Sequence, residues 1–159
     1  MIRLIDILTE AEYKISHREF NSKAKSYFNK LSDADVIALR SWTINLDKPS
    51  KPYITRKQAR KYISYAPNIT GVSQEFIKSL IGTKDFEVYR AYNTSTSSSG
   101  LKSYTLRSSA AQAFNYWDTK KIDTRTITYK DVIAVPAISF KGWEEAGSYD
   151  NEYEIVLSI

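Results

Sequence analysis

The chain has 159 residues, 42% of them hydrophobic, which is enough for one folded domain with a buried core. It has no cysteine and a single histidine, His17, so disulfides, thiolate nucleophiles and Cys-ligated zinc are excluded, and a Ser/His/Asp relay or a multi-His metal site is not favoured. The net charge of +5 at pH 7 favours anionic partners: nucleic acid, phosphorylated ligands or an acidic protein surface.

No stretch of the sequence suggests membrane insertion or export. The apolar residues never run long enough to span a bilayer, and the N-terminus has no unbroken apolar block of the signal-peptide type. We therefore expect a soluble, cytoplasmic protein with no membrane partner.

The first half of the chain has the three- and four-residue apolar spacing of amphipathic helices. Capping-box patterns mark two helix starts, Ser32 with Asp35 and Thr55 with Gln58. The second start opens the densest basic cluster, Thr55 to Lys61. This cluster is predicted to form the outer face of its helix rather than a nucleic-acid site.

A further helix is predicted from Ser73 to Gly82, after which the apolar period changes from about four residues to two, as is typical of strands. Helices followed by strands predict an α+β domain, with a helical part over 11–82 and a mixed β core over 83–159 that forms one unit with 31–82. Strands are predicted over Phe86 to Tyr92, Leu101 to Arg107, Asp131 to Ile138 and Glu152 to Ile159, with a short helix over Ser108 to Trp117.

Three of the predicted strands carry polar side chains with chemical uses. Arg90 is a charge in an aromatic strand, while Ser103 and Thr105 put two hydroxyls on one strand face. Glu152 and Glu154 share one face of the last strand, about 7 Å apart. Taken singly, each has an ordinary structural explanation, such as an edge position or a solvent-facing side. Two carboxylates so close nevertheless cost free energy unless a positive group or a reaction uses them.

Taken in order, these residues resemble the R-S-E class of mono-ADP-ribosyltransferases. The resemblance consists of an arginine strand, a Ser-x-Thr strand followed by a small-residue helix ending in phenylalanine, and a C-terminal Glu-x-Glu strand, over about Leu31 to Ile159. The middle strand reads Ser103-Tyr104-Thr105 where the family usually has Ser-Thr-Ser. The resemblance implies a β core of the ADP-ribosyltransferase type, NAD as the substrate and no metal.

The resemblance also implies a role for each polar residue. Glu154 would stabilise the oxocarbenium-like cation that forms when the bond between nicotinamide and ribose breaks. Glu152 would hold the acceptor and help to deprotonate it, and in members with Glu-x-Glu the acceptor is usually an arginine side chain. Arg90 would bind the NAD phosphates. Ser103 would hydrogen-bond and orient Glu154, and Thr105 would support the strand and pocket.

Three aromatic residues complete the predicted site. Phe114 matches the family position whose ring packs on nicotinamide, and it suits a helix-to-sheet core position equally well. Trp143 and Tyr149 lie in the stretch that corresponds to the acceptor-recognition loop, where they would contact the target or pack the loop.

Residues 1–10 resemble the capsid-targeting leader of T-even-like tailed phages. Leu8, Thr9 and Glu10 match the Leu/Ile-x-Glu signal of prohead proteases, and cleavage there would leave Ala11 first. An ordinary amphipathic helix explains the same residues. The resemblance implies a bacteriophage-encoded enzyme that is packaged in the capsid interior and injected into the host cytoplasm. Its targets would be host proteins, with the transcription and translation machinery as candidates.

Two other functions compete with arginine-directed transfer. The same fold could hydrolyse NAD or modify nucleic acid, which the basic charge permits. A protein of a different class, a basic and tyrosine-rich module, would bind RNA or a capsid component without catalysis.

Overall fold

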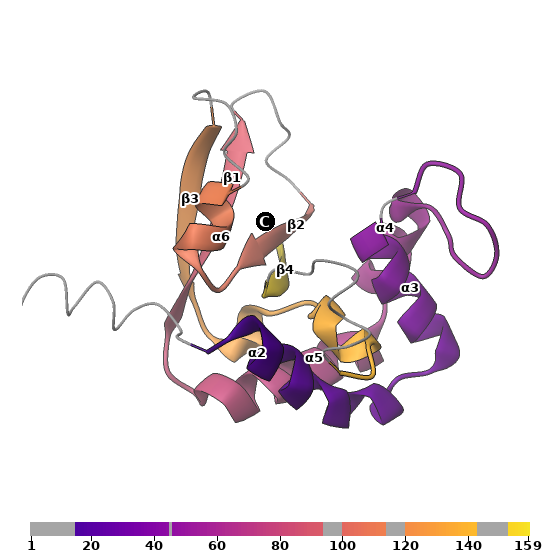
Figure 1. Ribbon diagram of the computed structural model, residues 1–159, viewed down its shortest axis with the longest axis horizontal. Helices are drawn as coiled ribbons and strands as arrows, with labels where there is room; N and C mark the ends of the chain where they lie inside the picture. Colours follow the sequence, from indigo (N-terminus) through magenta and orange to yellow (C-terminus); the bar gives the residue numbers. More distant parts are fainter. Residues whose placement is uncertain (1–14, 45, 94–99, 114–119, 143–152) are drawn as a thin grey trace, which may run out of the picture.

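Helices form the first half of the chain and strands follow, so the predicted α+β class is confirmed. The computed structural model describes residues 15–44, 46–93, 100–113, 120–142 and 153–159. Figure 1 shows the helices of the first half of the chain gathered below and to one side of the strands. The helical elements are α2 (His17–Ala24), η1 (Lys25–Lys30), α3 (Asp33–Ile44), α4 (Arg56–Ser64) and α5 (Pro67–Ile81).

Both predicted capping boxes are present, because the side chains satisfy backbone N–H groups that a helix start leaves free. At α3, the Asp35 amide donates to Ser32 Oγ and the Ser32 amide donates to Asp35 Oδ2, each at 3.1 Å. At α4, the Gln58 amide donates to Thr55 Oγ1 at 3.2 Å and the Thr55 amide donates to Gln58 Oε1 at 2.9 Å. The sequence thus locates both starts through local chemistry alone.

Helix α5 ends at Gly82 as predicted, but it begins at Pro67 rather than Ser73. Proline suits the first turn because its fixed φ is helical and its missing N–H would have no partner there. Ser73 is fully buried inside the helix, and its Oγ accepts a hydrogen bond of 3.0 Å from the Val135 amide instead of capping. Gly82 has φ 86°, a backbone conformation that favours glycine.

Four strands form one sheet in the order β3-β1-β2-β4, and every paired neighbour is antiparallel. The β1–β3 pairing extends from Phe86↔Ile127 to Asn93↔Lys120, whereas β1 meets β2 in a single registered pair, Tyr89↔Thr105. In Figure 1, β1 and β3 run together with α6 against them, and β2 turns away toward β4. The elements are β1 (Phe86–Asn93), β2 (Leu101–Thr105), α6 (Ser108–Ala113), β3 (Lys120–Ile127) and β4 (Glu154–Ser158).

The predicted strand over Asp131 to Ile138 is wrong, and strand β3 replaces it in the sheet. The apolar stretch instead forms η2 (Tyr129–Asp131) and η3 (Pro136–Ser139), with one isolated bridge between Ala134 and Val156. Pro136 has no N–H to donate and so cannot continue a ladder. Its apolar neighbours are buried all the same, which explains why their composition resembled a strand.

One apolar core joins the helices to the sheet. It contains Phe20 of α2, Leu39 of α3, Phe76 of α5 and Ile155 of β4, each fully buried. Because β4 closes this core from the sheet side, its first residue, Glu154, lies where helices and strands meet. Among the described residues, none of the helices is long and apolar enough to cross a membrane.

Candidate active site

Glu154 is held at the start of β4 by side chains from two distant parts of the chain. Ser103 Oγ on the neighbouring strand β2 donates a hydrogen bond to Glu154 Oε2. The indole Nε1–H of Trp42, on helix α3, donates to the same oxygen at 2.8 Å. Among the described residues, these hydrogen bonds to the carboxylate both end on Oε2. No hydrogen bond from a described residue reaches the other oxygen, Oε1.

The sheet register explains why Ser103 reaches Glu154. In the β2–β4 ladder, Ser103 is opposite Val156 and Thr105 is opposite Glu154. Directly opposed residues share a face, and so do residues two apart along a strand. Ser103, Thr105 and Glu154 therefore lie on one face, with the serine diagonal to the carboxylate.

The backbone immediately before Glu154 is strained. Tyr153 has φ 56°, which is rare for a bulky residue. Its buried ring packs against those of His17 and Phe20, with centroids 5.0 and 5.5 Å apart. These contacts to α2 hold Tyr153 in place. The backbone before Glu154 is therefore fixed by α2, and its carboxylate is fixed by Ser103 and Trp42.

Two arginines of α4 lie over the Trp42 ring. The guanidinium carbon of Arg56 is 4.4 Å from the ring centroid and that of Arg60 is 5.6 Å away, in cation–π range. Within the described residues, the Arg56 Nε is buried and has no hydrogen-bond partner. The predicted outer face of this helix is therefore wrong for Arg56, because Trp42 and Glu154 draw that side chain inward.

Four cations lie within electrostatic range of one another: Arg56, Arg60, Arg90 and Lys102, called the basic cluster below. Burial lowers the pKa of the Lys102 ammonium, and repulsion from the three arginines lowers it further. Burial also lowers the pKa of Arg56, as do Arg60 and Arg90, while the negative charge of Glu154 raises it. None of the four forms a salt bridge with a described acidic residue. Glu154 acts electrostatically on Arg56, and Arg90 acts on Asp123, so these four positive charges meet two negative ones. The excess positive charge suits an anionic ligand.

The electrostatics of Glu154 combine opposing effects. Burial raises the pKa of its carboxyl, because an ion loses solvation in the protein interior. Hydrogen bonds from Ser103 and Trp42 and the charge of Arg56 act in the opposite direction, and the net pKa remains above the ordinary value. A carboxylate of this kind is desolvated and fixed in place, so its charge acts strongly on a nearby cation.

Thr105 lies on the same face as this carboxylate, whereas Arg90 follows Tyr89, the residue opposite Thr105, and so lies on the other face of the sheet. Thr105 is buried directly opposite Glu154, and its Oγ1 accepts a hydrogen bond of 3.3 Å from the Arg107 amide. Arg90, on β1, is opposite Asp123 in the β1–β3 ladder and acts electrostatically on Arg56 and Lys102. No hydrogen bond between described residues joins Arg90 to Glu154, so its predicted role remains a prediction.

The other predicted site residues fall outside the described residues. These are the acceptor glutamate, the three aromatic residues and the leader: Glu152, Phe114, Trp143, Tyr149 and residues 1–10. Their assigned roles stay predictions. Within the described part of the chain, no group of three or more His, Cys, Asp or Glu side chains could hold a metal ion.

Sequence reasoning missed Trp42 and Arg56. Trp42 lies 112 positions before Glu154, inside a helix whose apolar pattern makes a buried tryptophan look like an ordinary core residue. Arg56 carries the same charge as its exposed neighbours on α4. Only the tertiary contacts of α3 with α4 and of Trp42 with Glu154 distinguish these two residues from the rest.

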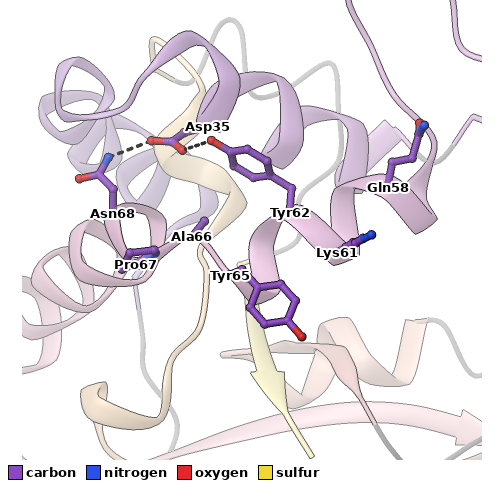
Figure 2. A pocket seen from close by; sticks show the side chains of 8 residues that line it. All are labelled: Asp35, Gln58, Lys61, Tyr62, Tyr65, Ala66, Pro67 and Asn68. Carbon is purple, nitrogen blue, oxygen red and sulfur yellow. Dashed lines mark hydrogen bonds between the residues drawn. The ribbon is translucent and has the colours of Figure 1, made fainter.

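A pocket of about 580 Å³ lies on the opposite face of α4 from Arg56 and Arg60. Figure 2 shows the Asp35 carboxylate between the side chains of Tyr62 and Asn68, each of which donates to it at 2.8 Å. Because both Asp35 oxygens already accept hydrogen bonds, we assign this carboxylate to stability. The pocket is lined by Asp35, Gln58, Lys61, Tyr62, Tyr65, Ala66, Pro67 and Asn68.

Asp35→Ala is expected to destabilise the fold by about 2 kcal/mol, because hydrogen bonds to a buried carboxylate and one half of a capping box are lost. Thermal unfolding should show a Tm about 4–8 °C lower. Burial opposes ionisation of Asp35, but its hydrogen bonds outweigh this and lower its pKa.

A lowered pKa gives stability that is present above the ordinary pKa of aspartate, about 4, and is lost as the pH falls through the folded-state value. The Tm difference should therefore shrink in acid. Asp33→Ala, at an exposed position of the same helix turn, is the matched control and should leave the Tm nearly unchanged. Equal Tm values for the Asp35 variant and the wild type at pH 7 would contradict the assignment.

Comparison with known proteins adds little to this geometry. No protein-family model matches the chain, and neither does any curated protein sequence. The crystal structure of the ADP-ribosyltransferase Vis in complex with agmatine is similar to the chain at a TM-score of 0.38 and 11% identity, over 92% of this chain and 77% of that one. A likeness this low carries no argument about function, which must come from the side chains themselves.

Proposed function

We propose that this chain is a mono-ADP-ribosyltransferase that transfers ADP-ribose from NAD to arginine side chains. The observation that carries the proposal is the Glu154 carboxylate, fixed at the start of β4 by the hydroxyl of Ser103 on β2. These two residues are the ones to which the sequence resemblance gives the catalytic carboxylate and its orienting hydroxyl.

The proposed reaction begins when the bond between the nicotinamide nitrogen and ribose C1′ breaks. Nicotinamide leaves with the bonding electron pair, and positive charge develops on the ribose as an oxocarbenium-like cation. The ionised Glu154 stabilises this cation electrostatically through its unengaged Oε1. An arginine nitrogen then forms the new bond to C1′, and Glu152 orients the guanidinium and accepts its proton.

The basic cluster supports the choice of substrate. NAD carries a negatively charged diphosphate, which the planar guanidinium of Arg90 can bind through paired hydrogen bonds. Arg56 and Lys102 add positive charge beside it, and each already experiences repulsion that a bound anion would relieve. We therefore assign the diphosphate to this cluster, whose member Arg56 acts electrostatically on the carboxylate that would act on the ribose.

The proposal also covers the residues that hold the arginine acceptor and the phage origin of the enzyme. Glu152, two positions before Glu154, is assigned to the arginine acceptor, with Trp143 and Tyr149 in its recognition loop. The leader at residues 1–10 assigns the enzyme to a phage capsid and its targets to host proteins. Cleavage after Glu10 would give a packaged form that starts at Ala11.

The test is incubation of the purified protein with NAD labelled in its adenylate half and a bacterial lysate. Label on discrete protein bands that neutral hydroxylamine removes supports arginine-directed transfer. Nicotinamide release without labelled protein or nucleic acid points to NAD hydrolysis. Label on nucleic acid would show that nucleic acid, and not an arginine side chain, is the acceptor. Neither label nor nicotinamide release, across several host lysates, overturns the enzymatic proposal. RNA binding with a steep salt dependence would then favour a binding module.

A further inference from the structure

Trp42 makes a contact that a core tryptophan does not need. Its side chain is 1% exposed, yet its one polar atom, Nε1, reaches a carboxylate on the last strand rather than a nearby backbone carbonyl. That carboxylate is Glu154, and the hydrogen bond falls on Oε2, which also accepts from Ser103. A helix in the first half of the chain thus reaches the proposed catalytic group directly.

The chemistry of the two donors differs. A serine hydroxyl both donates and accepts hydrogen bonds, so it can accompany either protonation state of a carboxyl group. An indole N–H only donates, so it requires an acceptor lone pair on Oε2. A donor-only partner at Oε2 favours the ionised carboxylate and directs any proton to Oε1. It also limits rotation of the carboxylate about its last bond.

We infer that Trp42 is a positioning residue of the proposed active site, which holds Glu154 ionised and presents its Oε1 to the ribose of NAD. This inference rests on the proposed function. The indole is fixed in turn by α4, because Arg56 stacks on its face at 4.4 Å. Helices α3 and α4 therefore act on the reaction through one aromatic ring.

The described groups around the carboxylate set its protonation. Ser103 of β2, Trp42 of α3 and Arg56 of α4 each favour the ionised form, against the burial that opposes it. Arg60, Arg90 and Lys102 place further positive charge around Arg56. Without the indole N–H the pKa of Glu154 rises, so activity that needs the ionised form is lost at a higher pH as the solution is acidified.

The test is Trp42→Phe, which keeps an aromatic ring under Arg56 and removes the donor. Nicotinamide release from NAD should fall about ten- to a hundredfold in kcat, with a much smaller change in KM. The acid limb of its pH profile should move up by about one pH unit. Replacement of Trp42 by 3-benzothienylalanine, which keeps the bicyclic shape without an N–H, should give the same result if phenylalanine disturbs folding.

Tyr62→Phe is the matched control. It removes a side-chain donor to a different carboxylate, Asp35, on the other face of α4. Its kcat and acid limb should equal those of the wild type even where its Tm falls. Parallel changes in both variants would show that a loss of stability, rather than positioning, lowers the activity, and would overturn the inference.

A second readout does not depend on turnover. Carboxyl carbon NMR of glutamate-labelled protein follows the titration of Glu154, assigned by its absence in Glu154→Gln. A higher Glu154 pKa in Trp42→Phe or in the benzothienyl form supports the inference, and an unchanged pKa overturns it. A wild type that never releases nicotinamide overturns the proposed function, and this titration then still decides whether Trp42 holds Glu154.

Discussion

Glu154→Gln is expected to lower NAD-dependent labelling and nicotinamide release by about 10²–10⁴-fold. Glutamine has the same shape, and its amide oxygen can still accept hydrogen bonds from Ser103 and Trp42, so the local structure has no reason to change. What disappears is the negative charge. A neutral amide cannot stabilise the cation that develops on the ribose, and the transition state loses its electrostatic partner.

The same variant should be at least as stable as the wild type at neutral pH. The pKa of Glu154 is raised in the folded protein, mainly by burial. A raised pKa means that the stability contribution is present below the unfolded-state value and is lost as the pH rises through the folded-state value. At pH 7 the ionised carboxylate therefore costs stability, and the neutral amide does not have this cost.

Labelling assays and thermal unfolding of the same preparations check both effects. Glu75→Gln makes the same chemical change at an exposed position, where Glu75 pairs with Lys30 at 2.6 Å, and should keep full activity. Full activity in Glu154→Gln would show that this carboxylate takes no part in the reaction. A large fall in its Tm would instead assign Glu154 to folding.

Glu152→Gln is expected to separate transfer from NAD cleavage. Transfer of ADP-ribose to free arginine or to protein should fall by about 10²–10⁴-fold, because the guanidinium, with a pKa above about 12, loses the group that orients it and accepts its proton. Nicotinamide release to water should persist, because bond cleavage depends on Glu154.

Parallel assays of arginine labelling and nicotinamide release, at equal enzyme and NAD concentrations, measure this separation. Asp150→Asn, which removes a carboxylate two positions earlier, is the control and should leave both rates unchanged. Equal losses of transfer and cleavage in Glu152→Gln would remove the proposed division of labour between the two glutamates. Unchanged transfer would show that the acceptor is held elsewhere.

Local chemistry explains which parts of the fold were predictable. The capping boxes at Ser32 and Thr55 and the stop at Gly82 depend on side chains and backbone angles within a few residues, so the sequence contains them in full. The strands that begin at Phe86 and Leu101 were predicted for a similar reason, since their apolar alternation is a property of the strand itself.

Strand β3 was missed because its sequence is highly charged and its extended form depends on a partner. Lys121, Asp123 and Arg125 alternate along a strand at the edge of the sheet, where charged side chains are common. Pairing with β1 along the whole strand provides the backbone hydrogen bonds that keep it extended. The prediction for the apolar stretch around Pro136 failed in the opposite way. Its composition favoured a strand, but Pro136 has no N–H to donate to a strand ladder.

By itself, the sequence determined the α+β order, the helix starts at Ser32 and Thr55 and the set of polar strand residues, because each depends on neighbours along the chain. The tertiary structure decided which of these residues meet. Ser103 reaches Glu154 through the β2–β4 register, and Trp42 reaches it only because α3 packs against η3, which contacts β4. Such contacts join positions far apart in the chain, and no local pattern encodes the distance between them.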